Sequence, residues 1–155
     1  GEIVDQFLQL KKLSSGPITN VVFMGMGEPL LNYKNVIAAA DLLHDPDGIN
    51  MGAKRITIST AGIIPKIKQF TAEAHKYKLA ISLNGSTQEQ RLKTMPISAA
   101  QSLEELLAAA TCYSRENKTR VTFEYVLIKD INEKIEDAQR LQEMLSPINC
   151  KLNVN

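Results

Sequence analysis

The chain has 155 residues, which suits one domain with a substantial core, and its 44% apolar and 23% charged residues are ordinary for a globular protein. Eighteen lysines and arginines against seventeen aspartates and glutamates leave a net charge of +1, so the composition gives no sign of a strongly basic nucleic-acid binder. Without an apolar run long enough to span a bilayer, or a visible signal peptide, we expect a cytoplasmic protein with no membrane segment.

Apolar residues at helical spacing alternate with short β-branched or apolar runs along the whole chain. In chain order, the pattern predicts a helix at 2–13, a strand at 20–24, a helix at 34–43, a strand at 55–60, a helix from 62 to about 77, a strand at 79–83, a short helix at 88–93, a helix at 102–116, a strand at 120–128, a helix at 133–145 and a strand at 150–154. Ser102 and Glu105 form a capping box at the start of their helix. This alternation is typical of βαβ units, so we expect an α/β fold with about five parallel strands.

The predicted elements at the two ends are incomplete units. The chain opens on a helix without a preceding strand and stops on a strand without a following helix. We therefore interpret residues 1–155 as a single domain that forms part of a larger, incomplete (β/α) barrel.

Small and polar residues gather where the predicted strands end, which is the edge at which parallel sheets bind ligands. In chain order these are Gly25, Gly27 and Glu28, then Ser59 and Thr60, then Ser82, Leu83 and Asn84, then Glu124 and Tyr125 within the fourth strand with Lys129 and Asp130 after it, and finally Asn153 and Asn155. Each residue alone is equally consistent with a strand end or a turn. Their shared edge makes the group a candidate site.

The segment from Gly25 to Glu28 is a poor phosphate loop. The dinucleotide fingerprint needs a third glycine, but position 30 is leucine, and no Walker lysine follows. Glu28 places negative charge where a phosphate needs donors, and Pro29 removes an N–H. A carboxylate here favours an ammonium instead. Serine and asparagine at the other strand ends suit a carboxylate, ribose hydroxyls and an adenine edge, so the edge fits an amino acid joined to a nucleoside.

The chain shows no metal-binding pattern of its own. Cys112 and Cys150 lie far apart, with no Cys-x-x-Cys pair and no histidine at ligand spacing, so we expect two reduced thiols in or near the core. His44 and His75 fall in predicted helical regions and are expected at the surface. We predict neither a catalytic residue nor a metal ligand in these 155 residues.

The segment 24–30, Met-Gly-Met-Gly-Glu-Pro-Leu, resembles the Gly-Glu-Pro motif of radical S-adenosylmethionine enzymes. Its longer form is similar to that of the adenine-C2 RNA methyltransferases, which modify large-subunit rRNA and some tRNAs. The supporting segments, which are collinear over essentially the whole chain, are 56–62, 80–84, Arg91 with 95–97, 121–126 and 150–153.

The resemblance implies a partial (β/α) barrel of the radical SAM type, S-adenosyl-L-methionine and a [4Fe–4S] cluster as cofactors, RNA as substrate, and a reducing partner such as flavodoxin or ferredoxin. Position by position, it implies that the S-adenosylmethionine contacts are Gly27, Glu28, Ser59, Ser82, Leu83, Asn84 and Asn153. Asn84 stands where many relatives have histidine.

The chain departs from the family pattern in its cysteines. The three-cysteine loop that holds the cluster, the methyl-carrying cysteine and the N-terminal RNA-binding region have no counterpart in these residues. We therefore expect the central part of a catalytic domain, inactive by itself. Two alternatives remain at this stage: a cofactor-binding module without redox chemistry, and an unrelated α/β-barrel lyase or aldolase, for which Lys129 is the only candidate lysine.

Overall fold

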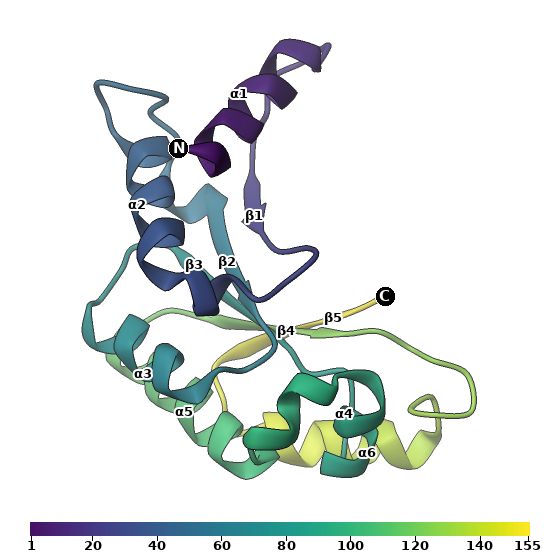
Figure 1. Ribbon diagram of the computed structural model, residues 1–155. Coiled ribbons are helices and arrows are strands. Elements are labelled where there is room, and N and C mark those ends of the chain that lie inside the picture. The colour runs from purple at the N-terminus through teal and green to yellow at the C-terminus, as the bar shows by residue number, and fades with distance from the viewer.

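Five parallel strands form one sheet in the computed structural model, which describes residues 1–155 (Figure 1). The strands are β1 (Val21–Phe23), β2 (Ile56–Thr60), β3 (Lys78–Ser82), β4 (Val121–Tyr125) and β5 (Cys150–Val154). Their spatial order is the same as their order in the chain, so every crossover moves one strand further in one direction, as in the wall of a barrel. Strands β1 and β5 do not pair, and the sheet is an open, partial barrel. The predicted fold class is confirmed.

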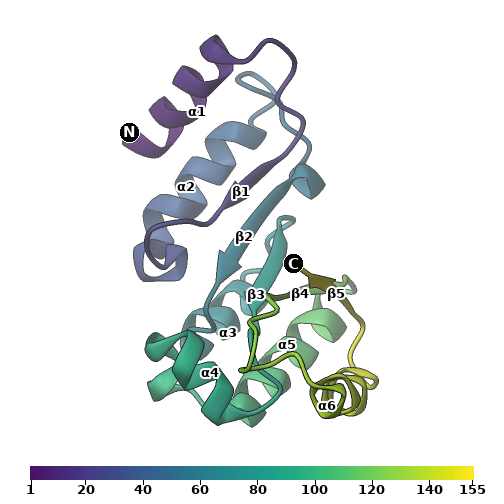
Figure 2. The same ribbon diagram turned by 90° about the vertical axis from the view of Figure 1, so that its right-hand side faces the viewer.

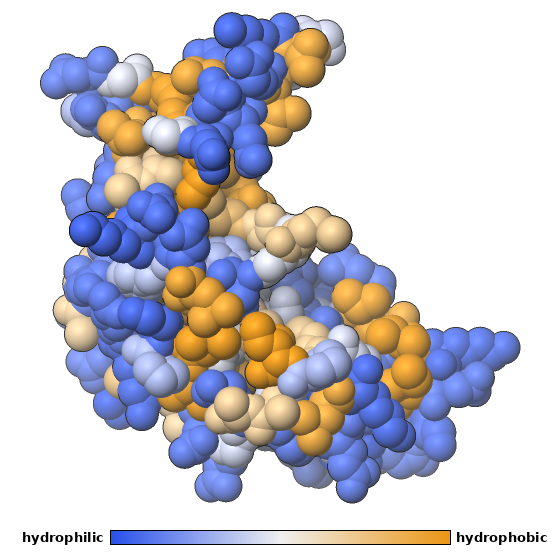
Figure 3. Space-filling model, in the orientation of Figure 1, coloured by the Kyte–Doolittle hydropathy of each residue, from blue (hydrophilic) through white to orange (hydrophobic).

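The helices pack along one side of this sheet (Figures 1 and 2). They are α1 (Glu2–Leu13), α2 (Tyr33–His44), α3 (Ile64–Ala72), α4 (Gln88–Thr94), α5 (Leu103–Glu116) and α6 (Ile135–Leu145), with the 3₁₀ turns η1 (Pro29–Asn32), η2 (Ala53–Arg55) and η3 (Pro96–Ala100). The other side is hollowed between the upper part of the molecule, with α1 and β1, and the lower part, with β4 and β5 (Figure 3). None of the helices has the length and apolarity needed to cross a membrane.

The strands separate the two faces of the sheet by simple alternation. On the helix side, Ile58, Leu79 and Phe123 are fully buried and belong to one continuous apolar core. On the hollow side, Ser82 pairs with Glu124 in register, and Glu124 pairs with Asn153. One face therefore stabilises the fold, while the other presents polar groups to the hollow.

Four of the predicted element boundaries differ from the structure by two residues or more, and the first is the start of α3, which begins at Ile64 rather than at residue 62. Helix α3 ends at Ala72 rather than near residue 77, and Ala74 has a positive φ of 50° that no α-helix continues through. Strand β4 ends at Tyr125 rather than at residue 128, because the Asn132 side chain bonds the Val126 carbonyl at 2.9 Å and the Ile128 N–H at 2.7 Å. Helix α6 begins at Ile135, two residues later than predicted.

Two local predictions were only partly right. The Ser102 hydroxyl caps α5 by accepting from the Glu105 N–H at 3.1 Å, but it also donates to the Glu105 carboxylate, so the reciprocal half of the capping box is missing. His75 is not a surface helix residue: it lies in the loop before β3, half-buried, with its ring stacked at 6.0 Å on that of Tyr77. His44 ends α2 and is also half-buried.

Candidate functional site

The loop between β1 and η1 owes its shape to two glycines. Gly25 and Gly27 have φ values of 131° and 141°, a region that L side chains rarely adopt. The Gly27 N–H donates to the Gly25 carbonyl at 2.9 Å, which closes a tight turn. The loop projects over the hollow (Figure 3), and together with Ile3 and Gln6 of α1 it lines a pocket of about 350 Å³.

Glu28, directly after this turn, is half-buried and has a fixed carboxylate. Its Oε1 accepts from the Leu30 N–H at 2.9 Å, which caps η1, and its Oε2 accepts from the Ala61 N–H at 2.6 Å. The second bond joins the β1 loop to the end of β2. Each carboxylate oxygen keeps one lone pair for another donor. The residue therefore presents a pre-oriented negative charge at the end of β2, which suits an ammonium group.

A polar row crosses the hollow face beside Glu28. Ser82, Glu124 and Asn153 are cross-strand neighbours on β3, β4 and β5, and all three are half-buried. The Asn153 Nδ2 donates to the Glu124 Oε1 at 2.8 Å. Ser59 lies on the same face one step nearer the amino ends of the strands, opposite Ala80, and is only 4% exposed. Of the residues predicted from the sequence, Ser82 and Asn153 are thus brought together.

Leu83 and Asn84 lie beside the row but point elsewhere. The Leu83 side chain is fully buried in the core, and its N–H and carbonyl are bonded to the Glu124 carbonyl at 2.8 Å and to the Arg91 guanidinium at 2.6 Å. Asn84 has a positive φ of 48°, and its Oδ1 accepts from the Val126 N–H at 3.0 Å. The Asn84 side chain therefore holds the β3 turn against the loop after β4.

Arg91 is a structural residue at the carboxyl ends of the strands, an edge that we call the rim. No local sequence pattern predicts its contacts. Its side chain is fully buried and donates to the carbonyls of Ser82 at 2.9 Å, Leu83 at 2.6 Å and Ala61 at 3.0 Å. Burial lowers the pKa of Arg91 to about 10. Ala61 also donates its N–H to the Glu28 carboxylate, so Ala61 connects the buried Arg91 guanidinium to Glu28. Arg91 thus fixes the ends of β2 and β3.

A second buried group anchors the turn after β3. Asp137 of α6 accepts from the Ser86 hydroxyl at 2.6 Å, the Gln90 amide at 2.7 Å and the Arg140 guanidinium at 2.5 Å. Burial alone would raise the pKa of Asp137, but these hydrogen bonds outweigh it and hold the pKa at about 2. The anchor ties α6 to α4 beneath the rim.

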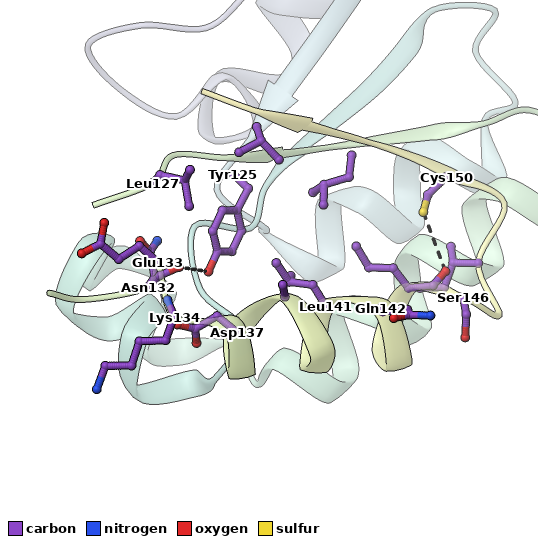
Figure 4. Close-up of a pocket in the computed structure, with 15 residues that line it drawn as sticks. Tyr125, Leu127, Asn132, Glu133, Lys134, Asp137, Leu141, Gln142, Ser146 and Cys150 are labelled. Atoms are coloured by element: carbon purple, nitrogen blue, oxygen red, sulfur yellow. Dashed lines mark hydrogen bonds between the residues drawn. The ribbon is translucent and has the colours of Figure 1, made fainter. Parts of the chain in front are cut away.

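An apolar pocket lies on the opposite, helix-covered side of the sheet (Figure 4). Tyr125 of β4 and Leu141 of α6 point into it, and the Tyr125 hydroxyl donates to the Asn132 carbonyl at 2.8 Å. Cys150 lines its other end and is half-buried, like Cys112 of α5. Two cysteines are fewer than the set of thiolates that holds an iron–sulfur cluster, and no third cysteine, histidine or carboxylate joins them in a metal-binding group.

The lyase or aldolase alternative finds no support in the structure. Lys129 is exposed in the loop after β4 and lies outside the polar groups of the hollow face. The polar groups of the hollow face are instead carboxylate, hydroxyl and amide, the types that suit a zwitterion attached to a nucleoside.

Comparison with known proteins places this geometry in a family. The chain is 52% identical over 153 residues to a probable dual-specificity RNA methyltransferase RlmN of Leptospira interrogans, covering 99% of this chain and 43% of that protein. It is 46% identical over 155 residues to a protein of the same description from Thermotoga maritima, covering 100% and 45%. The crystal structure of a radical SAM methyltransferase from Sphaerobacter thermophilus superposes with a TM-score of 0.92 at 37% identity, covering 99% of this chain and 46% of that one.

These relatives are longer proteins, and the chain spans less than half of their length. The family model for the Radical SAM superfamily matches residues 1–141, which is nearly the whole chain. The matched region contains strands β1 to β4, the glycine turn with Glu28, and Ser82 and Glu124 of the polar row; β5 with Asn153 follows it. The chain belongs to the radical SAM superfamily.

Proposed function

We propose that the complete protein is an RNA methyltransferase that adds a methyl group to carbon 2 of adenine in large-subunit rRNA and tRNA, and that residues 1–155 form the central part of its catalytic domain. Relatives at 46–52% identity described as dual-specificity RNA methyltransferases support this activity. A reducing partner such as flavodoxin or ferredoxin and a cytoplasmic location complete the proposal.

In this proposal S-adenosyl-L-methionine binds across the hollow face, at the carboxyl ends of the strands. The observation that carries it is the fixed carboxylate of Glu28, held by two backbone N–H groups with a lone pair left on each oxygen. Glu28 accepts from the methionyl ammonium, and Gly27, without a side chain, leaves the approach open. Ser59, Ser82, Leu83, Asn84 and Asn153 complete the contacts.

The residues fit S-adenosylmethionine but not the [4Fe–4S] cluster. The cluster supplies the electron that cleaves the sulfonium, and the chain's own part is to bind and orient the cofactor and to exclude water from it. No step is assigned to Cys112 or Cys150, since neither faces the rim.

Calorimetry on the complete protein with Glu28→Gln tests the cofactor site. We expect S-adenosylmethionine binding to weaken by about 1.5–3 kcal/mol, because a charge-assisted hydrogen bond is lost. Binding of 5′-methylthioadenosine, which lacks the ammonium, should change much less. Glu143→Gln, at an exposed position on α6, is the matched control. Equal affinity of Glu28→Gln and the unaltered protein for S-adenosylmethionine refutes the assigned role.

The RNA activity is tested by mass spectrometry of rRNA and tRNA from cells with and without the gene. Loss of 2-methyladenosine on deletion supports the proposal. If the complete protein binds S-adenosylmethionine but leaves the RNA unmodified and the cofactor uncleaved, it is a binding module without redox chemistry.

A further inference from the structure

Glu124 lies in the middle of the polar row, and the proposed function gives it no task. We infer that Glu124 is a further nucleoside-recognition residue: its carboxylate accepts a hydrogen bond from a ribose hydroxyl and sets the orientation of the Asn153 amide. The inference rests on the proposed function, because it concerns the same cofactor site.

The position of Glu124 is fixed by the two neighbouring strands and by the turn that follows β3. In register it lies opposite Ser82 on β3 and Asn153 on β5. Its backbone carbonyl accepts from the Leu83 N–H at 2.8 Å and the Asn84 N–H at 3.4 Å. Glu124 therefore contacts four of the residues proposed to bind the cofactor.

The carboxylate of Glu124 has unused capacity. Its Oε1 accepts from the Asn153 Nδ2 at 2.8 Å and its Oε2 from the Asn155 Nδ2 at 3.3 Å, which leaves one lone pair on each oxygen. No lysine or arginine forms a salt bridge with it. A half-buried carboxylate without a cationic partner repels a phosphate or carboxylate of a ligand and attracts a donor. A neutral vicinal diol supplies two such donors.

The spacing along the rim separates this group from the ammonium. The Glu28 carboxylate is bonded at the end of β2, whereas Glu124 is on β4, two strands away. Two strand spacings amount to about 10 Å. One carboxylate therefore binds the amino-acid end of a ligand, and the other binds a group further along it, which in an amino acid joined to a nucleoside is the sugar.

The bond to Asn153 also decides which way that amide points. An ionised carboxylate only accepts, so the Asn153 Nδ2 faces Glu124 and the Oδ1 faces away, without an intramolecular partner. The free Oδ1 is an acceptor for the exocyclic amine of adenine. An amide at position 124 has both a donor and an acceptor, so Glu124→Gln also allows the reversed orientation of Asn153, and Glu124 therefore acts on the base as well as on the sugar.

Calorimetry on the complete protein with 5′-methylthioadenosine and its 2′-deoxy and 3′-deoxy forms tests this role. We expect Glu124→Gln to weaken binding of the parent nucleoside about tenfold or more, the loss typical of a hydrogen bond to a charged group. We also expect non-additivity: removing the bonded hydroxyl should cost the unaltered protein about tenfold and the variant little. Glu143→Gln should bind all three ligands like the unaltered protein.

The outcomes separate the two proposals. Equal binding of the nucleoside by Glu124→Gln, or equal losses on deoxygenation in both proteins, overturns the role of Glu124 while leaving the cofactor site intact. No binding of S-adenosylmethionine by the unaltered protein overturns both. If Glu124→Gln melts at a lower temperature, the deoxy series on the unaltered protein decides: no loss with either analogue overturns the inference.

Discussion

Replacing Arg91 by methionine should destabilise the protein strongly. Methionine keeps much of the side-chain volume but none of the donors, so the carbonyls of Ala61, Ser82 and Leu83 each lose a buried hydrogen bond. At about 2 kcal/mol for each unmade bond, the loss is about 6 kcal/mol. Burying the charged guanidinium, which lowers the pKa of Arg91 to about 10, costs about 3 kcal/mol of stability. The uncharged methionine side chain does not carry this cost. We expect a net loss of about 3 kcal/mol.

Urea unfolding followed by circular dichroism measures this loss at neutral pH. Arg115→Met is the matched control, because the Arg115 side chain is 74% exposed and its removal should change the free energy of unfolding by under about 0.5 kcal/mol. Arg91→Lys keeps a charge but not the planar fork of donors, so its free energy of unfolding should lie between those of Arg91→Met and Arg115→Met. A loss below about 1 kcal/mol for Arg91→Met would show that these carbonyls find other donors, and the positioning role would be wrong.

Two further predictions concern the fold beneath the rim. The stabilisation from Asp137 is present above about pH 4, where the unfolded carboxylate is also ionised, and is lost as the pH falls towards 2. Asp137→Asn should therefore lower the free energy of unfolding at pH 7 by on the order of 2 kcal/mol and flatten the decline of that free energy between pH 4 and 2. An unchanged acid slope of the free energy of unfolding, measured by urea titrations, would contradict this. Gly62→Ala should cost about 2–4 kcal/mol, because Gly62 has a φ of 115° and an added Cβ would lie 2.9 Å from Leu106 Cδ1. Gly52→Ala, at an open position with a φ of −58°, should be neutral or slightly stabilising, and equal thermal melting of the two alanine variants would refute the steric argument.

The sequence was sufficient to predict the order and type of the main elements because both depend on local periodicity. Alternation in β4 and helical spacing in α1 each appear within a dozen residues. Boundaries failed where a distant or irregular group decides them. The predicted β4 is three residues too long at its end, where the Asn132 amide bonds Val126 and Ile128, and no pattern within the strand itself indicates that contact.

The candidate site could be located from the sequence but not described. Shared strand ends were enough to bring Ser82 and Asn153 into one row. What each side chain is bonded to depends on register between strands and on long-range contacts. The bond from Arg91 to the Ala61 carbonyl spans 30 residues of sequence, and the bond from Asn153 to Glu124 spans 29. Such pairings become visible only once the sheet is assembled.

The alternation of faces along β4 links the evolution of the site to that of the core. Phe123 and Glu124 are adjacent in sequence but serve opposite sides of the sheet. Deleting or inserting a single residue in this strand would exchange their sides, burying a carboxylate in the core and exposing a phenyl ring in the hollow. Descendants of this protein can therefore change length in the loops between elements, but the strands that form the rim can vary only by substitution.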